Sequence, residues 1–323
     1  MRFDAAPLEG VTDYPFREAH AVCFPGTDRY FSPFIAANRT CSLKTREKKE
    51  TAPEHNSGVL LVPQILTNVP EAAAWAAGQM AERGYREVNI NLGCPSASVV
   101  SHGKGAGQLA DPGRLDAYFG QLFDLLGARG SLPVRVSVKT RIGLEEENAG
   151  ELVRIYNRYP LSEVIVHPRL RTDFYKGKPD LKAFRIFYES CVHPVIYNGD
   201  IVDRESFRRI AEAFPDLPGV MIGRGLAANP ALIRVLKGGE PVTGSEMKRF
   251  HDEVYGRRLS AYGHFGHISG KMKELWYYMG CLYPGADDAL MRIRRSREQD
   301  EYERAAADLF SRFAPDPGAW FRS

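Results

Sequence analysis

The sequence contains few cysteines, and they form no pattern. They include no Cys-x-x-Cys pair and no group with the spacing of metal ligands. A disulfide-stapled secreted fold and a cysteine-based metal site are therefore not expected, and free thiols indicate a reducing compartment. We predict a cytoplasmic protein without a metal centre. The five cysteines are Cys23, Cys41, Cys94, Cys191 and Cys281.

Long apolar runs are also missing. None approaches the ~18 consecutive residues that a membrane span needs, and the N-terminal MRFDAAPLEG lacks the apolar core of a signal peptide. We therefore expect no membrane association. The hydrophobic fraction of 44% is nevertheless ordinary for a globular protein with a core.

Two nucleotide-binding motifs are absent as well. No Gly-x-Gly-x-x-Gly follows the first apolar run, so a Rossmann-type dinucleotide site is not supported. The stretch GKGAG at 103–107 lacks the spacing of a phosphate-binding P-loop and the Ser or Thr after its lysine. A nucleoside triphosphatase is therefore not expected.

Short apolar runs alternate with helical patterns along most of the chain. Eight such strand–helix units in series predict a closed parallel (β/α)8 TIM barrel, with an open doubly wound sheet as the alternative. The runs lie at 3–7, 29–34, 59–65, 87–92, 134–139, 163–167, 194–198 and 219–223.

The helical patterns carry recognisable start and stop signals. The alanine-rich stretch at 70–84 ends in a glycine, and the stretch at 111–130 begins with Asp111, which can cap a helix. A glycine-rich break at 235–246 ends the alternation, and no strand-like run follows it. We predict a barrel domain over 1–238 and a small helical domain over 239–323.

Polar residues gather where the apolar runs end. In a TIM barrel the carboxyl ends of the strands form the active-site face, so these residues should meet at one rim. Taken singly, Lys139 would be a surface charge and His167 a structural histidine; their places after buried runs favour function instead. The run ends carry Pro7, Leu8, Glu9, Gly10, Gln64, Asn91, Gly93, Cys94, Lys139, Arg141, His167, Asn198, Gly199, Asp200, Gly223, Arg224 and Gly225.

Glycines follow the seventh and eighth runs, in YNGDI and MIGRG. In barrels this position often binds phosphate, because backbone N–H groups can approach the anion there. The alternative is that these glycines only form tight turns. Occurring together, they favour a phosphorylated cofactor.

The small net charge of +3 is unevenly distributed. The segment 39–49 has five Lys or Arg against one Glu, and 168–178 has four against one Asp, so the rest of the chain is negative. Both segments follow predicted strands at the active-site rim, which suits a polyanionic substrate, although solvated charge is the common explanation. A third cluster, Arg292, Arg294, Arg295 and Arg297, lies in the predicted helical domain and is our candidate there for a nucleic-acid contact.

Five motifs in order resemble those of the tRNA-dihydrouridine synthases. They are APLEGVTDYPFR at 6–17, NLGCPS at 91–96, VKTRIG at 138–143, YNGDI at 197–201 and MIGRG at 221–225. The resemblance implies an FMN-containing TIM barrel that uses NADPH to reduce a particular uridine of tRNA to 5,6-dihydrouridine. It therefore also implies tRNA as the partner.

The resemblance also implies roles for single residues. Cys94 corresponds to the general acid, and Asn91, Arg141 and Tyr175 correspond to positions that contact the uracil. The FMN positions correspond to Pro7, Leu8, Glu9, Gln64, Lys139, His167, Asn198, Gly199, Asp200, Gly223 and Arg224.

The sequence departs from the family pattern at three places. The third run ends in PQILTN, at 63–68, where a Q-L or Q-x-x-G pattern is more usual. In HPRLRTDFYKG, Leu170 replaces a threonine and Asp173 replaces a glutamine, and Ser32 and Pro33 stand where Thr-Glu is common. These changes spare the flavin positions and concern the contacts to the substrate.

The chemistry explains why a thiol should follow a strand in NLGCPS. Reduction of the uracil C5–C6 bond needs a hydride at C6, which a flavin supplies, and a proton at C5. A thiol with a free pKa near ~8.5 is a suitable acid, with Gly93 allowing close approach and Pro95 fixing the loop. Arg141 and Asn91 would stabilise the charge on the uracil oxygens, and Lys139 would face the N1–O2 edge of the flavin.

Other functions remain open at this point. Cys94 could be a small core residue, and the chain could be a flavin-dependent reductase of free pyrimidines or a tRNA-binding relative without catalysis. The basic rim and the added helical domain favour the tRNA enzyme. We expect a monomer with no obligate protein partner.

Overall fold

The computed structural model describes residues 1–127 and 134–319, and these contain a nine-stranded parallel sheet. The strand order is β3-β2-β1-β9-β8-β7-β6-β5-β4. The strands are β1 (Arg2–Ala5), β2 (Arg29–Phe31), β3 (Leu61–Val62), β4 (Gln64–Ile65), β5 (Glu87–Leu92), β6 (Arg135–Arg141), β7 (Val164–His167), β8 (Val195–Tyr197) and β9 (Gly219–Ile222).

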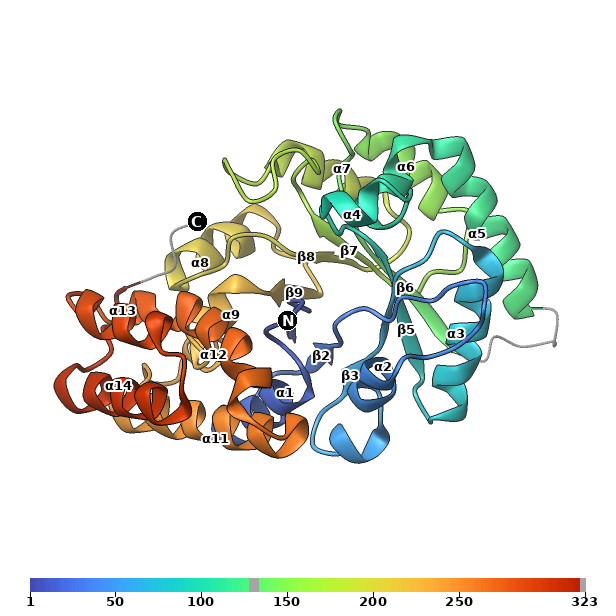
Figure 1. Ribbon diagram of the computed structural model, residues 1–323. Coiled ribbons are helices and arrows are strands. Elements are labelled where there is room, and N and C mark those ends of the chain that lie inside the picture. The colour runs from blue at the N-terminus through green and yellow to red at the C-terminus, as the bar shows by residue number, and fades with distance from the viewer. Residues whose placement is uncertain (128–133, 320–323) are drawn as a thin grey trace.

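The third predicted run forms two of these strands, so the expectation of eight is corrected to nine. Leu61 and Val62 pair with β2, whereas Gln64 and Ile65 pair with β5. Pro63 lies between them and has no N–H to give to a ladder. Because β3 and β4 are consecutive in the chain and stand at the two ends of the strand order, they bring the sheet round into a nearly closed barrel, which confirms the predicted fold (Figure 1).

Helices surround the barrel. The predicted helix at 70–84 spans Pro70–Glu82, and the one at 111–130 spans Pro112–Gly127, with the Asp111 carboxylate accepting from the backbone N–H of Arg114; residues 128–130 lie outside the described part. These two helices are α3 and α5, respectively. The other barrel helices are α1 (Tyr14–Cys23), α2 (Thr45–Glu50), α4 (Ala97–Val100), α6 (Ala149–Tyr156), α7 (Leu181–Ser190), α8 (Arg204–Ala213), α9 (Arg224–Ala228) and α10 (Leu232–Leu236). Two short 3-10 helices also belong to the barrel: η1 (Pro53–His55) and η2 (Gly105–Ala110).

The amino-terminal end of the barrel is closed by buried charges. Arg29, the first residue of β2, donates to Asp4 of β1 at 2.7 Å and to Glu163 just before β7 at 2.5 Å. It also contacts Glu87, the first residue of β5. Above this layer, six apolar side chains from five strands and the residue after β1 fill the barrel: Ala6, Phe31, Val62, Ile165, Ile196 and Met221. The interior is therefore packed up to the carboxyl ends of the strands, where a site can form.

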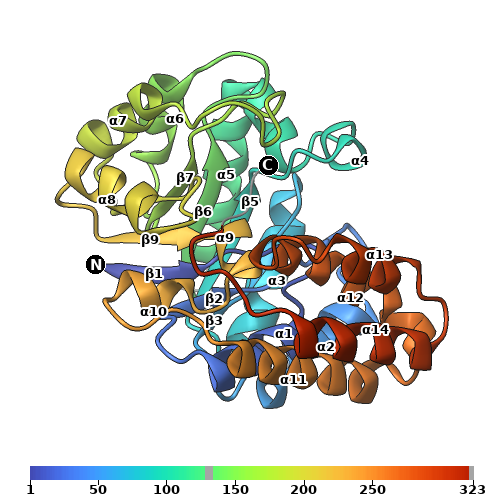
Figure 2. The ribbon, with the colours of Figure 1, turned by 90° about the vertical axis from the view of Figure 1, so that its left-hand side faces the viewer.

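The chain ends in a helical region, as expected. It comprises α11 (Gly244–Tyr262), α12 (Phe265–Met279), η3 (Gly280–Leu282), α13 (Asp287–Arg295) and α14 (Gln299–Arg312). These helices lie together beside α1 and α9 (Figures 1 and 2). They share one apolar cluster with Val11 and with Phe16 and Phe24 at α1. None of the described helices combines the length and the hydrophobicity that crossing a membrane requires.

Candidate active site

A cavity opens at the carboxyl ends of the strands, where the polar run ends were expected to meet. Ten of the predicted site residues line it, and they come from five strands and the loops that follow them. They are Pro7, Leu8, Glu9, Gln64, Asn91, Cys94, Lys139, Arg141, His167 and Tyr175.

The Cys94 loop is held in place by Asn91, near the carboxyl end of β5. The Asn91 side-chain oxygen accepts from the backbone N–H groups of Gly93 and Cys94 at 3.0 and 2.9 Å. Its amide nitrogen donates to Gln64 Oε1 at 2.7 Å, and Gln64 in turn donates to Asn89 at 2.8 Å. The buried amides of neighbouring strands thus hold the loop, and with it the thiol, in one position.

Arg141 connects the Cys94 loop to the loop after β7. Its Nε donates to the Gly93 carbonyl at 2.9 Å, and its Nη atoms donate to the carbonyls of Leu170 and Phe174 at 2.8 and 3.1 Å. The side chain is buried, and burial lowers the pKa of Arg141 to about 10. Tyr175 follows Phe174, so Arg141 places both the thiol and the tyrosine at the mouth of the cavity.

Two basic side chains, the half-buried Lys139 and the buried His167, line the same cavity as Cys94. Burial and the charge of Arg141 lower the pKa of Lys139 to about 7, and within residues 1–127 and 134–319 no hydrogen bond or ion pair engages its ammonium. Burial and four surrounding cations hold the pKa of His167 well below its usual range, so this imidazole is neutral. Its Nε2 lies 3.2 Å from Arg169 Nη1, and it therefore accepts there.

The Cys94 thiol is set up to keep its proton. Burial raises the pKa of Cys94 above its ordinary value, despite the lowering effect of a hydrogen bond to the Ser96 backbone and of the Arg141 and Lys139 charges. A thiol that stays protonated at neutral pH is suited to donate a proton and poorly suited to act as a thiolate nucleophile.

The loops after β8 and β9 form a tight second part of the site. Asp200 pairs with Arg169 at 2.5 Å and with Arg224 at 2.7 Å. The Arg224 guanidinium lies 4.2 Å from the centre of the Tyr175 ring, which joins this part to the cavity. A Cβ at Gly199 would come within 2.2 Å of the Tyr197 hydroxyl, so no larger residue fits there. Five of the predicted FMN-binding residues belong to these two loops and do not line the cavity itself. They are Asn198, Gly199, Asp200, Gly223 and Arg224.

The donor set matches a flavin phosphate ester. The Lys139 ammonium, which no residue in the described part of the chain engages, is available for the electron-rich edge of an isoalloxazine ring, and Gln64 and Asn91 offer amides in the same cavity. Compact glycine turns with an adjacent arginine follow β8 and β9, the usual place for phosphate in this fold. The cavity and these turns are contiguous through Tyr175, as a phosphorylated ring cofactor requires.

The sequence matches the family profile described as "Dihydrouridine synthase (Dus)" over residues 4–307. The chain belongs to the dihydrouridine synthase family. It is 29% identical over 289 residues to a "Probable tRNA-dihydrouridine synthase" of Rhodobacter capsulatus, covering 86% of each chain. It is 27% identical to "tRNA-dihydrouridine synthase B" of Pasteurella multocida, over 73% of this chain and 69% of that protein.

Solved structures agree on the fold. Morphinone reductase in complex with tetrahydroNAD superimposes with a TM-score of 0.53 at 12% identity, covering 75% of this chain and 88% of that one. This likeness concerns the barrel alone. Together with the family match, it confirms the expected TIM barrel and the expected class of enzyme, a dihydrouridine synthase of the flavin-dependent type.

In this dihydrouridine synthase the atypical loop after β7 has its own internal support. The Asp173 carboxylate accepts from the backbone N–H of Leu170 at 2.8 Å, so the two departures from the family pattern form one turn. Arg171 reaches across to the Pro95 carbonyl at 3.3 Å. The changed residues therefore support a turn from which Arg171 contacts the Cys94 loop.

Two residues of the site, Phe34 and Arg169, were missed from the sequence, and Pro33 was named only as a departure from the family pattern. Pro33 and Phe34 line the cavity, and Arg169 bridges His167 and Asp200. The first two follow β2, so applying the strand-end argument to the second run would have found them. Arg169 stands out in the sequence only as a cation two residues after His167. This signal is weak because the whole segment 168–178 is basic.

Proposed function

We propose that this protein reduces a uridine of tRNA to 5,6-dihydrouridine with FMN as its cofactor and NADPH as its reductant. The observation that carries the proposal is the placement of a protonated thiol, Cys94, and of an ammonium that no described residue engages, Lys139, in one cavity lined by strand ends. An acid for the substrate and a cation for the flavin are the two groups that the reaction asks of the protein.

The cofactor would lie across the strand ends. Lys139, Gln64 and His167 would contact the ring, and the turns at Gly199–Asp200 and Gly223–Arg224 would hold the phosphate. Bound FMN would supply the hydride, received from NADPH, that goes to C6 of the uracil. The neutral His167 can donate from Nδ1, because its Nε2 accepts from Arg169.

Cys94 would deliver the proton to C5 of the uracil. The loop that carries it is fixed from both sides, by Asn91 through two backbone N–H groups and by Arg141 through the Gly93 carbonyl. Such fixed geometry avoids reorganisation when the proton moves. Within residues 1–127 and 134–319, Arg141 and Asn91 each keep one side-chain N–H that makes no hydrogen bond, which leaves a donor for the uracil carbonyls.

The target base has to leave its stack in the folded RNA to reach this cavity. Basic segments beside the mouth would hold the flanking phosphates. Arg46 of α2 pairs with Glu9, whereas Arg171 lies against the Cys94 loop. Both belong to the two segments with excess positive charge, so binding should weaken as salt rises.

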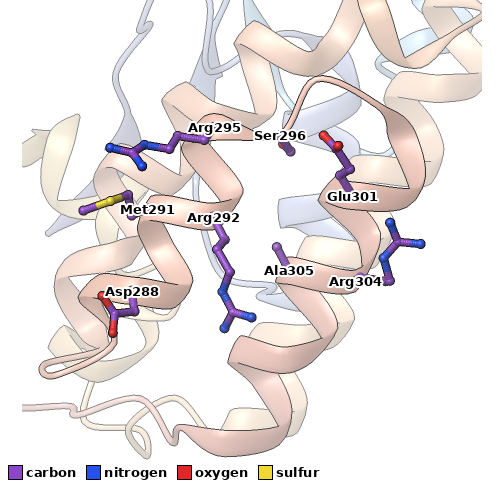
Figure 3. Close-up of a pocket in the computed structure, with 8 residues that line it drawn as sticks. All are labelled: Asp288, Met291, Arg292, Arg295, Ser296, Glu301, Arg304 and Ala305. Atoms are coloured by element: carbon purple, nitrogen blue, oxygen red, sulfur yellow. The ribbon is translucent and has the colours of Figure 1, made fainter.

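The helical region, proposed as the domain 239–323, would add a second RNA contact. Figure 3 shows Arg292 in the groove between α13 and α14, where it pairs with Asp308. Arg294, Arg295 and Arg297 are exposed, and among the described residues no ion pair engages them. These three, more than Arg292, are available for phosphates.

The deciding experiment is to map dihydrouridine by mass spectrometry in tRNA from cells with and without the gene, together with the visible spectrum of the purified protein. Loss of dihydrouridine at a defined position and a flavin spectrum would support the proposal and identify the uridine. A yellow protein with unchanged tRNA would favour a small-molecule flavin reductase. A colourless protein that binds tRNA would indicate a relative without catalysis.

A further inference from the structure

The exposed aromatic residues of the described chain are few, and they share one place. They are Phe174, Tyr175 and Tyr277, with 43%, 39% and 62% of their surfaces exposed. Tyr175 lines the cavity. Single exposed apolar side chains are ordinary on a globular surface, whereas several gathered at one opening mark a contact site. The positions of the other two therefore bear on what the cavity mouth binds.

Phe174 lies on the side of the mouth that carries the thiol. Its backbone is in the left-handed region, with φ of 52°, and its carbonyl accepts from Arg141. The Arg171 guanidinium lies 5.3 Å from the centre of the Phe174 ring and also donates to the Pro95 carbonyl of the Cys94 loop. The strained backbone is thus held so that this ring stands beside the thiol loop and under a cation.

Tyr277 belongs to α12, a helix that lies across the open end of the barrel from α4, which follows the Cys94 loop (Figures 1 and 2). Its ring packs 5.2 Å from the ring of Tyr278. Tyr278 in turn lies close enough to Tyr175 and Arg224 for both to affect its pKa, which burial raises to about 12. One turn earlier, Glu274 reaches the β1 loop, where a Cβ at Gly10 would come within 2.7 Å of its Oε2. This face of α12 therefore runs along the rim of the cavity.

We infer that Phe174 and Tyr277 are stacking platforms for the two RNA bases that flank the reduced uridine. The inference rests on the proposed function and adds a specific contact to it. When a base is extruded, its neighbours lose their stacking partner, and an aromatic ring on each side of the mouth can replace it. Aromatic rings beside arginine are the usual surface for single-stranded bases, because every base has a face that stacks.

The arrangement favours RNA bases over other occupants. One ring belongs to the loop after β7 and the other to α12, which lies across the open end of the barrel from α4 (Figure 2). A single strand must pass on both sides of an extruded nucleotide. Arg171 lies next to the Phe174 ring and can contact a phosphate of the same strand. A nicotinamide reductant would need one ring surface over the flavin, not two at the rim.

The test compares Phe174→Ala and Tyr277→Ala with Tyr277→Phe, which keeps the ring, and with Leu60→Ala. Leu60 is 64% exposed and directly precedes β3, at the opposite end of the barrel. Each alanine variant should raise KM for tRNA about tenfold, the usual effect of losing one stacked base, while the rate of flavin reduction by NADPH is unchanged. Tyr277→Phe and Leu60→Ala should match the unaltered protein.

Salt and a modified substrate separate stacking from charge. The slope of log affinity against log salt should be the same for the alanine variants as for the unaltered protein, whereas Arg294→Glu should reduce it. A tRNA without a base next to the target uridine should bind the unaltered protein and one of the two variants equally.

Three results would overturn the inference: unchanged KM for tRNA in both alanine variants, a changed salt slope, or an increase confined to KM for NADPH. Failure of the proposed function would look different, since the unaltered protein would then form no dihydrouridine.

Discussion

Arg258 of α11 and Asp13, at the start of α1, form a fully buried ion pair with a distance of 3.0 Å between Nη2 and Oδ1. The same guanidinium donates to the Val11 carbonyl at 2.6 Å. Val11 and Thr12 donate back to the Leu8 carbonyl, so the pair is connected to the loop that lines the cavity. The helical region therefore supports one wall of the active site in addition to any role in binding RNA.

Replacing Arg258 by Met should cost stability and flavin together. Leaving a buried carboxylate without its partner costs about 3–5 kcal/mol, measured as the free energy of unfolding in urea at pH 7. The protein should also retain less flavin after gel filtration, because the β1 loop is released. Arg257→Met is the matched control: Arg257 is half-buried and pairs with Glu18 and Glu253, so it should cost less than about 1 kcal/mol. Full flavin retention in a destabilised Arg258→Met protein would contradict the link to the loop.

The same pair predicts a pH dependence of stability. Burial alone would raise the pKa of Asp13, but Arg258 and Lys271 lower it below its ordinary value. Because the folded state holds this proton less tightly than the unfolded state, the stabilisation is present above the ordinary pKa and is lost as pH falls through the lowered one. Acid unfolding should therefore begin below about pH 4, and it should begin at a higher pH in Arg258→Met.

The barrel and its rim could be predicted because local chemistry determines them. Each strand carries its own apolar run, and polar residues at the run ends are brought together by the parallel sheet. The split at Pro63 was equally visible as a missing donor in the third run, although the run was taken as one strand. Local signals of this kind need no knowledge of the partners.

The supporting contacts could not be predicted, because their partners lie far apart in the sequence. Arg258 and Asp13 are separated by 245 positions, and Arg141 meets carbonyls from two different loops. Every residue has a backbone carbonyl, so no sequence motif identifies which carbonyl will accept a hydrogen bond. Similarity to a family suggested that Asn91 and Arg141 contact the substrate, and the structure adds that both hold the loop that carries the thiol.

Cys94→Ala should separate the two half-reactions. A general acid contributes about 10²- to 10⁴-fold, so dihydrouridine formation should fall by at least about 100-fold while NADPH still reduces the flavin at its normal rate. Stopped-flow absorbance measures the first step and mass spectrometry of tRNA the second. Because burial raises the pKa of Cys94, the acid form persists at neutral pH, and activity should decline only at alkaline pH. A variant with normal dihydrouridine formation would exclude this role.

Lys139→Met should increase stability and reduce flavin binding. The pKa of Lys139 is lowered to about 7, so between that pH and the ordinary value of 10.5 the unfolded chain binds more protons than the folded one. Stability of the flavin-free protein therefore rises with pH across this window, and at pH 7 the methionine variant should be more stable by up to a few kcal/mol.

Flavin binding should show the opposite dependence on pH at the same residue. Only the protonated Lys139 can neutralise an electron-rich ring edge, so the affinity of the flavin-free protein for FMN should fall as pH rises above 7. Fluorescence titration of FMN at several pH values measures it. In Lys139→Met the affinity should be lower and nearly independent of pH over this range; an unchanged affinity would remove Lys139 from the flavin site.

Gly225→Ala tests the turn after β9 against a matched glycine. A Cβ at Gly225 would come within 2.2 Å of the Ile201 carbonyl oxygen, and neither backbone can move without shifting the two loops proposed to hold the phosphate. We expect a loss of stability of about 1–3 kcal/mol and loss of bound flavin. At Gly78, inside α3, a Cβ would meet nothing within 4 Å, so Gly78→Ala should stabilise the helix by up to about 1 kcal/mol and leave flavin bound. Urea unfolding measures the change in stability, and the visible absorbance of the bound flavin measures how much cofactor each variant retains. Equal flavin content in the two variants would mean that the close packing of this turn is not needed by the cofactor.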